Sequence, residues 1–170
     1  MEFRSEIITE RNLKMNSNLS LFSSNELSFA QNLQLQISQK EFEIKLVDIN
    51  RQYSTPLNSG DYYYNQQRKM LIEMEISNLK IQRDGHLNNS LNYALELAEF
   101  EIANKNNFSS AAIVLSNVYS FISINNIRFV LNTFVISKIY SISFSLLQNP
   151  LEYSLLRTEI NKLKLYFHIP

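Results

Sequence analysis

The stretch from Gly85 to Pro150 constrains the fold most, because it holds three helix-length apolar patterns separated by asparagine-rich breaks. In the first pattern, steps of three and four residues place four apolar side chains on one helical face: Leu87, Leu91, Leu95 and Ala98. The same steps recur between Ala111 and Ile122. These runs are too long for typical strands, so the spacing predicts antiparallel helical hairpins, each burying one face against its neighbour.

Composition also favours an all-helical fold. Among 170 residues there are 2 glycines and 3 prolines, too few for the many turns of a β-sandwich or barrel. The content of 45% apolar and 12% aromatic residues suffices for a folded core. We expect an all-α fold, an antiparallel helical-hairpin stack of about six helices. We expect a flexible N-terminal arm over residues 1–20 and a single helical domain over residues 21–170.

Turn and capping residues set the expected helix ends. Ser23 and Glu26 form a capping-box pattern at the start of the first long helix. Gly85 is suited to a left-handed cap, which predicts that a helix ends there. With the remaining breaks, the expected helices cover residues 25–53, 61–83, 86–104, 109–123, 127–148 and 151–167.

Charge is balanced overall but unevenly distributed along the chain. The 16 basic and 16 acidic residues give no net charge, so direct contact with nucleic acid is not expected. Between residues 106 and 151 the charged side chains are Arg128 and Lys138 alone. A segment so poor in charge is expected to be covered on most sides, by its own chain or by a partner. We expect 127–148 to be the central helix, with Phe134 in the core.

Few residues are arranged for catalysis. The chain has no cysteine, no phosphate loop and no nucleophile motif, and His86 and His168 lie far apart. Glu96, Glu99 and Glu101 cluster in sequence, and a helical enzyme with a carboxylate-bound metal is one function class to consider. Without an E-x-x-H motif we interpret the cluster as a solvated helix face. We expect no enzyme activity, no catalytic, cofactor or metal site, and no small-molecule substrate.

No uninterrupted run approaches the roughly 18 apolar residues of a membrane span. The closest candidate, residues 127–147, is interrupted by Arg128, Asn132 and Lys138. The N-terminus mixes acidic and basic residues and lacks the apolar core of a signal peptide. We therefore expect an intracellular, cytoplasmic protein without a membrane span.

A turn followed by a helix pattern occurs twice within residues 71–149. Gly85-His86 precedes Ser90-Leu91-Asn92-Tyr93-Ala94, and a second turn at Ser123–Asn126 follows after about 40 residues. This arrangement resembles tetratricopeptide-type helical repeats, which implies a hairpin array that binds a partner peptide. The second turn has no glycine, and the tryptophan and proline positions typical of the family are absent.

A second motif covers residues 127–139. It reads Ile127-Arg128-Phe129-Val130-Leu131-Asn132-Thr133-Phe134 and continues through Lys138-Ile139. This run resembles the long central helix of GINS replication-complex subunits, which implies a helical subunit of a larger assembly. The chain lacks most of the basic residues that follow in that family, and it shows no strand-rich domain downstream.

Three consecutive tyrosines, Tyr62, Tyr63 and Tyr64, are the most unusual local feature. At a helix start they cannot all face one direction, so at least one should be exposed. Because tyrosine combines contact area with a polar tip, we consider them a candidate interaction surface, with partial packing against the preceding loop as the alternative.

The sequence thus predicts a non-enzymatic protein–protein interaction module or scaffold, which binds a partner peptide or subunit on a helical surface. The alternative is an obligate helical subunit of a larger multiprotein assembly, for example a replication-type complex.

Overall fold

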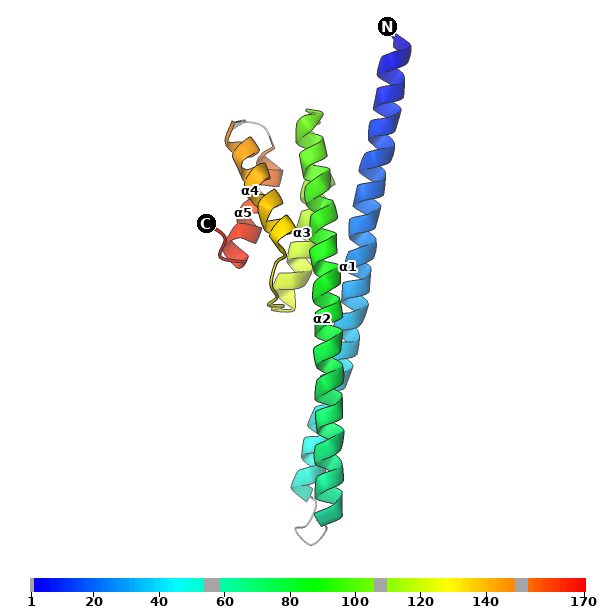
Figure 1. The fold of residues 1–170 in the computed structure, drawn as a ribbon, viewed down its shortest axis with the longest axis vertical. Coiled ribbons are helices and arrows are strands. Elements are labelled where there is room, and N and C mark those ends of the chain that lie inside the picture. The colour runs from blue at the N-terminus through cyan, green and yellow to red at the C-terminus, as the bar shows by residue number, and fades with distance from the viewer. Residues whose placement is uncertain (1, 54–58, 106–109, 149–152) are drawn as a thin grey trace. The chain divides into compact units, whose positions relative to one another are not determined.

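The computed structural model describes residues 2–53, 59–105, 110–148 and 153–170, and within these ranges all regular structure is helical (Figure 1). This confirms the all-α class. Five helices are present rather than six: α1 (Glu2–Tyr53), α2 (Ser59–Ala103), α3 (Ser110–Ile124), α4 (Thr133–Gln148) and α5 (Ser154–Tyr166).

The helix count differs because α2 passes through Gly85 without a break. The predicted left-handed cap is wrong, since neither glycine has a positive φ. On both sides of Gly85 the buried and half-buried positions keep steps of three and four: Leu79, Arg83, His86 and Ser90. Glycine in a helix interior costs about 1 kcal/mol relative to alanine, and contacts on both sides of it offset that cost.

α1 begins at Glu2, well before the start predicted at Ser23. Ser23 does not cap a helix. Its side chain is fully buried, and its hydroxyl donates to the carbonyl oxygen of Ser90 at 2.8 Å, while the Ser90 hydroxyl donates to the carbonyl of Ser23 at 2.8 Å. Residues 2–20, expected to be a loose arm, belong to this helix; their flexibility stays a prediction.

The chain divides into two compact units. One unit, here called the hairpin unit, is Phe29–Gly85, and the other, the bundle unit, is Met1–Ser28 with His86–Pro170. A single domain over residues 21–170 is a statement about cooperative folding, and it stays a prediction.

In the hairpin unit, α1 and α2 pair antiparallel through rows of side chains spaced as in a coiled coil. The core consists of Ile37, Val47, Ile72 and Ile76, with Ile44 and Leu79 packed against it. Three ion pairs join the two helices beside this core: Lys40–Glu75 at 2.8 Å, Lys69–Asp48 at 2.9 Å and Lys80–Glu41 at 3.4 Å. The seam is therefore apolar at its centre and charged along its edges.

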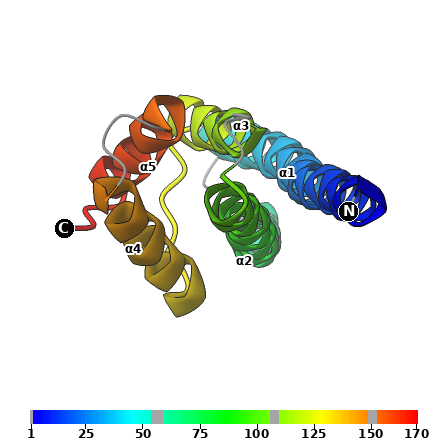
Figure 2. The ribbon, with the colours of Figure 1, turned by 90° about the horizontal axis from the view of Figure 1, so that it is seen from above.

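In the bundle unit, α5 contacts both α3 and α4 (Figure 2). Each of α2 to α5 contributes fully buried aliphatic side chains to the core: Leu91, Leu95, Leu115, Ile122, Ile139, Ile142, Ile160 and Leu163. The asparagine turn predicted after α3 is confirmed, since Asn126 adopts a left-handed φ of 48°.

Residues 127–132 join α3 to α4 without forming helix, although the sequence predicts helix from residue 127. Asn88 of α2 holds this segment: its amide nitrogen donates to the carbonyl of Val130 at 3.1 Å, and its side-chain oxygen accepts the N–H of Asn132 at 2.8 Å. The Asn132 side chain then accepts the N–H of Val135 at 2.8 Å and caps α4. These bonds satisfy backbone groups that a continuous helix would otherwise use.

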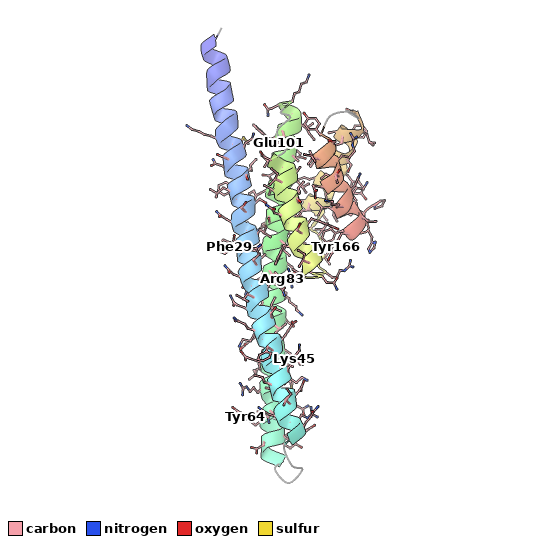
Figure 3. The ribbon with its side chains drawn as sticks, turned by 180° about the vertical axis from the view of Figure 1, so that it is seen from behind. Phe29, Lys45, Tyr64, Arg83, Glu101 and Tyr166 are labelled. Atoms are coloured by element: carbon pink, nitrogen blue, oxygen red, sulfur yellow. The ribbon has the colours of Figure 1, made fainter. Side chains whose placement is uncertain are left out.

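Tyr166, at the end of α5, contacts the first residues of the 127–132 segment (Figure 3). Its hydroxyl donates to the carbonyl of Ile127 at 2.9 Å. The guanidinium of Arg128 lies 4.7 Å from the centre of the Tyr166 ring, and Tyr119 of α3 meets that ring edge to face. Three elements thus converge on the connection.

The prediction that Phe134 lies in the core is wrong, because its side chain is 74% exposed. The buried face of α4 consists of Val135, Ile139, Ile142 and Leu146. Adjacent residues on a helix project about 100° apart, and Phe134 projects from Val135 toward the exposed side of α4, away from Ile139 and Ile142. The apolar residues around α4 suggested a central helix, but only one side of α4 is buried and the other side is exposed.

We expect Gly85→Ala to stabilise the protein by about 0.5–1 kcal/mol, because alanine loses less backbone freedom than glycine on entering a helix. A Cβ at Gly85 meets no atom within 4 Å. Urea unfolding measures the change. Gly60→Ala, equally open but in the first turn of α2, is the control and should gain less. A loss of stability in Gly85→Ala would indicate a left-handed backbone at this position.

Candidate interaction surfaces

The three tyrosines predicted as an interaction surface lie in the first turns of α2, where Figure 3 labels Tyr64. Tyr62 is 41% exposed, Tyr63 67% and Tyr64 65%. Arg51 of α1 donates to the Tyr62 hydroxyl at 2.9 Å, with its guanidinium 4.7 Å from the ring centre. Tyr62 is thus partly used within the hairpin, whereas Tyr63 and Tyr64 are open to solvent. Their role in binding stays a prediction.

Tyr63 and Tyr64 begin an apolar surface on the side of α2 that faces away from α1. We call it the α2 stripe; all of its members are more than half exposed: Tyr63, Tyr64, Met70, Leu71, Met74 and Ile81. The gaps in the stripe carry uncharged polar groups, from Gln67, Ser77 and Asn78. Glu73 lies at one edge, where it lines a shallow hollow with Met70 and Met74.

α1 carries a comparable surface on its side opposite the hairpin seam. This α1 stripe consists of Leu35, Phe42, Leu46 and Ile49, each exposed by 45% or more. Leu35, Phe42 and Ile49 are seven residues apart, so they project in nearly the same direction. The exposed residues from 31 to 49 include two charged ones, Glu41, which pairs with Lys80, and Lys45 (Figure 3).

A third apolar surface, the α4 face, lies in the bundle unit. Its members are Phe134, Tyr140, Phe144 and Leu147, with exposed fractions of 74%, 45%, 64% and 77%. Lys138 is the one charged residue of α4, and it turns toward α2, where its ammonium contacts Glu96 at 2.8 Å and Glu99 at 3.8 Å. The exposed side of α4 is therefore free of charge.

The carboxylates considered as metal ligands have other partners. Glu96 and Glu99 both form ion pairs with Lys138. His86 lies within α2 rather than in a turn, and its ring forms a 2.6 Å hydrogen bond with Glu26 of α1. In the part of the chain that the structure describes, no group of three or more histidine, aspartate or glutamate side chains is placed to hold a metal ion. None of the described helices combines the length and hydropathy needed to cross a membrane.

No family model, curated protein or solved structure matches the chain. The resemblances to tetratricopeptide-type repeats over residues 71–149 and to GINS subunits over residues 127–139 therefore stay expectations. In the structure, the Gly85-His86 turn of the first lies inside α2, and residues 127–132 of the second are not helical.

One buried carboxyl was not anticipated. Glu101, interpreted above as part of a solvated face, is 1% exposed (Figure 3). Its two carboxyl oxygens accept the N–H of Ala111 at 3.2 and 3.4 Å, at the N-terminus of α3. Burial raises the pKa of Glu101 from 4.5 to about 7, against the opposing effect of the Ala111 and Ser110 N–H donors. Glu101 follows Leu97 and Ala98 by four and three residues, so it lies on the same buried side of α2. This spacing is the signal in the sequence that could have predicted its burial.

We expect Glu101→Gln to abolish a pH dependence of stability. Because the folded-state pKa is raised, the contribution of Glu101 to stability is complete below pH 4.5 and is lost as pH rises to about 7. The difference corresponds to roughly 3 kcal/mol. Glutamine keeps an acceptor for the Ala111 N–H without a charge, so urea midpoints of the variant should exceed wild type at pH 8 and match it near pH 4.5. Glu99→Gln is the control, and parallel pH profiles for wild type and Glu101→Gln would contradict the assignment.

A second prediction compares two apolar residues of α4. Ile139 is fully buried, and Ile139→Ala should cost about 2–5 kcal/mol because it leaves a cavity. Phe134→Ala should change the free energy of unfolding by less than about 0.5 kcal/mol, as is usual for surface sites. Both are measured by urea unfolding. Equal losses in the two variants would mean that Phe134 is buried in solution.

Proposed function

We propose that the protein is a non-enzymatic interaction module, a scaffold that binds a partner peptide or subunit on its helical surface. The observation that carries this proposal is the α4 face, on which Phe134, Phe144 and Leu147 are each at least 64% exposed with no charged residue among them. Monomeric soluble proteins rarely expose contiguous apolar surface beyond a few hundred Å², and larger patches mark binding sites.

The composition of the α4 face indicates the chemistry of the partner surface. Aromatic residues are enriched and charged residues depleted in the centres of interfaces. Tyr140, Phe144 and Leu147 recur at steps of four and three along α4, as in a helix that places anchors into an apolar groove, and Phe134 projects to one side of them. Since the exposed side has no charge, the partner surface is apolar and needs no charged group to pair with it.

The Lys138–Glu96 ion pair holds α4 against α2. Lys138 is 20% exposed, so its charge is largely covered by the bundle unit itself. The ion pair thereby keeps the face oriented without adding a charge to it. A partner meets a preformed surface, which lowers the entropic cost of binding.

An obligate subunit of a larger assembly is the second candidate. It is favoured by the occurrence of exposed apolar surfaces on three helices, α1, α2 and α4, rather than on one. A subunit enclosed by neighbours needs several such surfaces, because obligate interfaces resemble a domain core cut in half.

We expect Phe144→Glu to release the protein from its partner complex while leaving its own stability within about 0.5 kcal/mol of wild type. A glutamate on the α4 face would lose its hydration on binding without gaining an ion-pair partner. Native electrophoresis and chemical cross-linking in extracts of the source cells, with a tagged chain, report the size of the complex. Asn117→Glu, on the exposed side of α3, is the matched control.

An unchanged complex size for Phe144→Glu would contradict the role of the α4 face. The purified chain separates the two candidates. A scaffold should be folded alone, with helical circular dichroism and a cooperative melting transition, whereas an obligate subunit should fold stably only with its neighbours.

A further inference from the structure

The central positions of the α2 stripe alternate steps of four and three residues, so their spacing reads the same in both directions. Its central positions are Tyr63, Gln67, Met70, Met74, Ser77 and Ile81, at steps of four, three, four, three and four. The chemistry is also symmetric about residue 72, because apolar, polar and apolar positions precede it and apolar, polar and apolar positions follow it. Such a stripe is complementary to an inverted copy of itself.

We propose that α2 pairs with α2 of a second copy of this chain, antiparallel, about a two-fold axis level with residue 72. A two-fold interface uses the same surface on both copies, so self-complementarity is its requirement. Each position i then meets position 144 − i of the second copy, in the manner of an antiparallel coiled coil. Tyr63 meets Ile81, Gln67 meets Ser77, and Met70 meets Met74.

Few charges adjoin the central positions of the proposed contact. Arg68 meets no acidic residue of the second copy in this register, because its counterpart is position 76, and Glu75 pairs with Lys40 of α1. At one edge Glu73 approaches its own copy near the axis, where solvent reduces the repulsion. The remaining charges of this part of α2 turn toward α1, for example in the Lys69–Asp48 and Lys80–Glu41 pairs.

The apolar area is adequate for a stable dimer. Six residues that are each 58–70% exposed offer on the order of 600 Å² of apolar surface per copy. A standard interface buries about 800 Å² per partner, which the polar positions and edges of the stripe supplement. The α1 stripe has four such residues and carries Lys45, so it is the less suited of the two outer faces of the hairpin unit.

This inference rests on the proposed function, because it treats the outer helix faces as interfaces. It extends that function by naming a second copy of the chain as the partner of the α2 stripe. It also gives the predicted Tyr63 and Tyr64 surface a specific place at the two ends of the dimer contact. The α4 face remains available for a different partner.

Light scattering of the purified chain should give twice the monomer mass at micromolar concentration. Met74→Glu should yield the monomer, because two buried carboxylates would face the apolar centre of the stripe. Met74→Leu should remain dimeric, and Phe42→Glu, the matched charge on the α1 stripe, should leave the dimer intact. A monomeric wild-type chain, or a dimer that Met74→Glu does not dissociate, would overturn the proposal. Phe144→Glu should also stay dimeric, so failure of the α4 proposal is distinguishable from failure of this one.

The register can be tested with single cysteines, because the chain has none of its own. Positions 63 of the two copies lie about 27 Å apart in the proposed dimer, at 1.5 Å per residue. A mixture of Tyr63→Cys and Ile81→Cys chains should therefore cross-link with a short thiol-reactive reagent, while Tyr63→Cys alone should not. Efficient cross-linking of Tyr63→Cys to itself would indicate parallel helices and overturn the antiparallel arrangement.

Discussion

The continuity of α2 is the constraint on which the rest of the structure depends. Its first half supplies Ile72 and Ile76 to the hairpin core, and its second half supplies Leu91 and Leu95 to the bundle core. One helix thus takes part in the core of each unit.

The second half of α2 also positions three other elements through polar side chains. Asn88 holds the segment before α4, Glu96 pairs with Lys138 within α4, and Glu101 accepts the first N–H groups of α3. The Glu101 contact shows how two opposing effects are resolved. Carboxylates are favoured at helix N-termini, yet burial disfavours the charge, and burial is the larger effect, which raises the pKa of Glu101 to about 7.

The sequence predicts the helical class and most of the bundle core correctly, because Leu87, Leu91 and Leu95 follow one helical face. It does not reveal the full length of α1 and α2, because buried polar residues lie between them. Ser23 and Ser90 satisfy each other in the bundle unit, and in the hairpin unit Arg83, 5% exposed, donates to Gln34 at 2.7 Å. Such residues interrupt an apolar pattern and suggest a helix end where there is none.

The long helices also carry apolar residues on two opposite sides. In α1 the step of five from Ile37 to Phe42 marks the change from the buried seam to the exposed stripe. In α2, Ile72 and Ile76 belong to the seam, whereas Met70 and Met74 belong to the stripe. A one-faced helix would show a single clean period. The two interleaved periods explain why the apolar pattern of these helices looked irregular.

Charge placement connects this architecture to function. In the hairpin unit, lysine and acidic side chains pair across the seam, and in α4 the lysine pairs with α2. These intramolecular ion pairs thus neutralise several of the charges that lie beside the outer faces. A partner that covers these faces desolvates apolar groups, amides and hydroxyls, and it avoids the several kcal/mol that each uncompensated buried ion would cost. The same residues that stabilise the fold therefore keep the exposed surfaces suited to association.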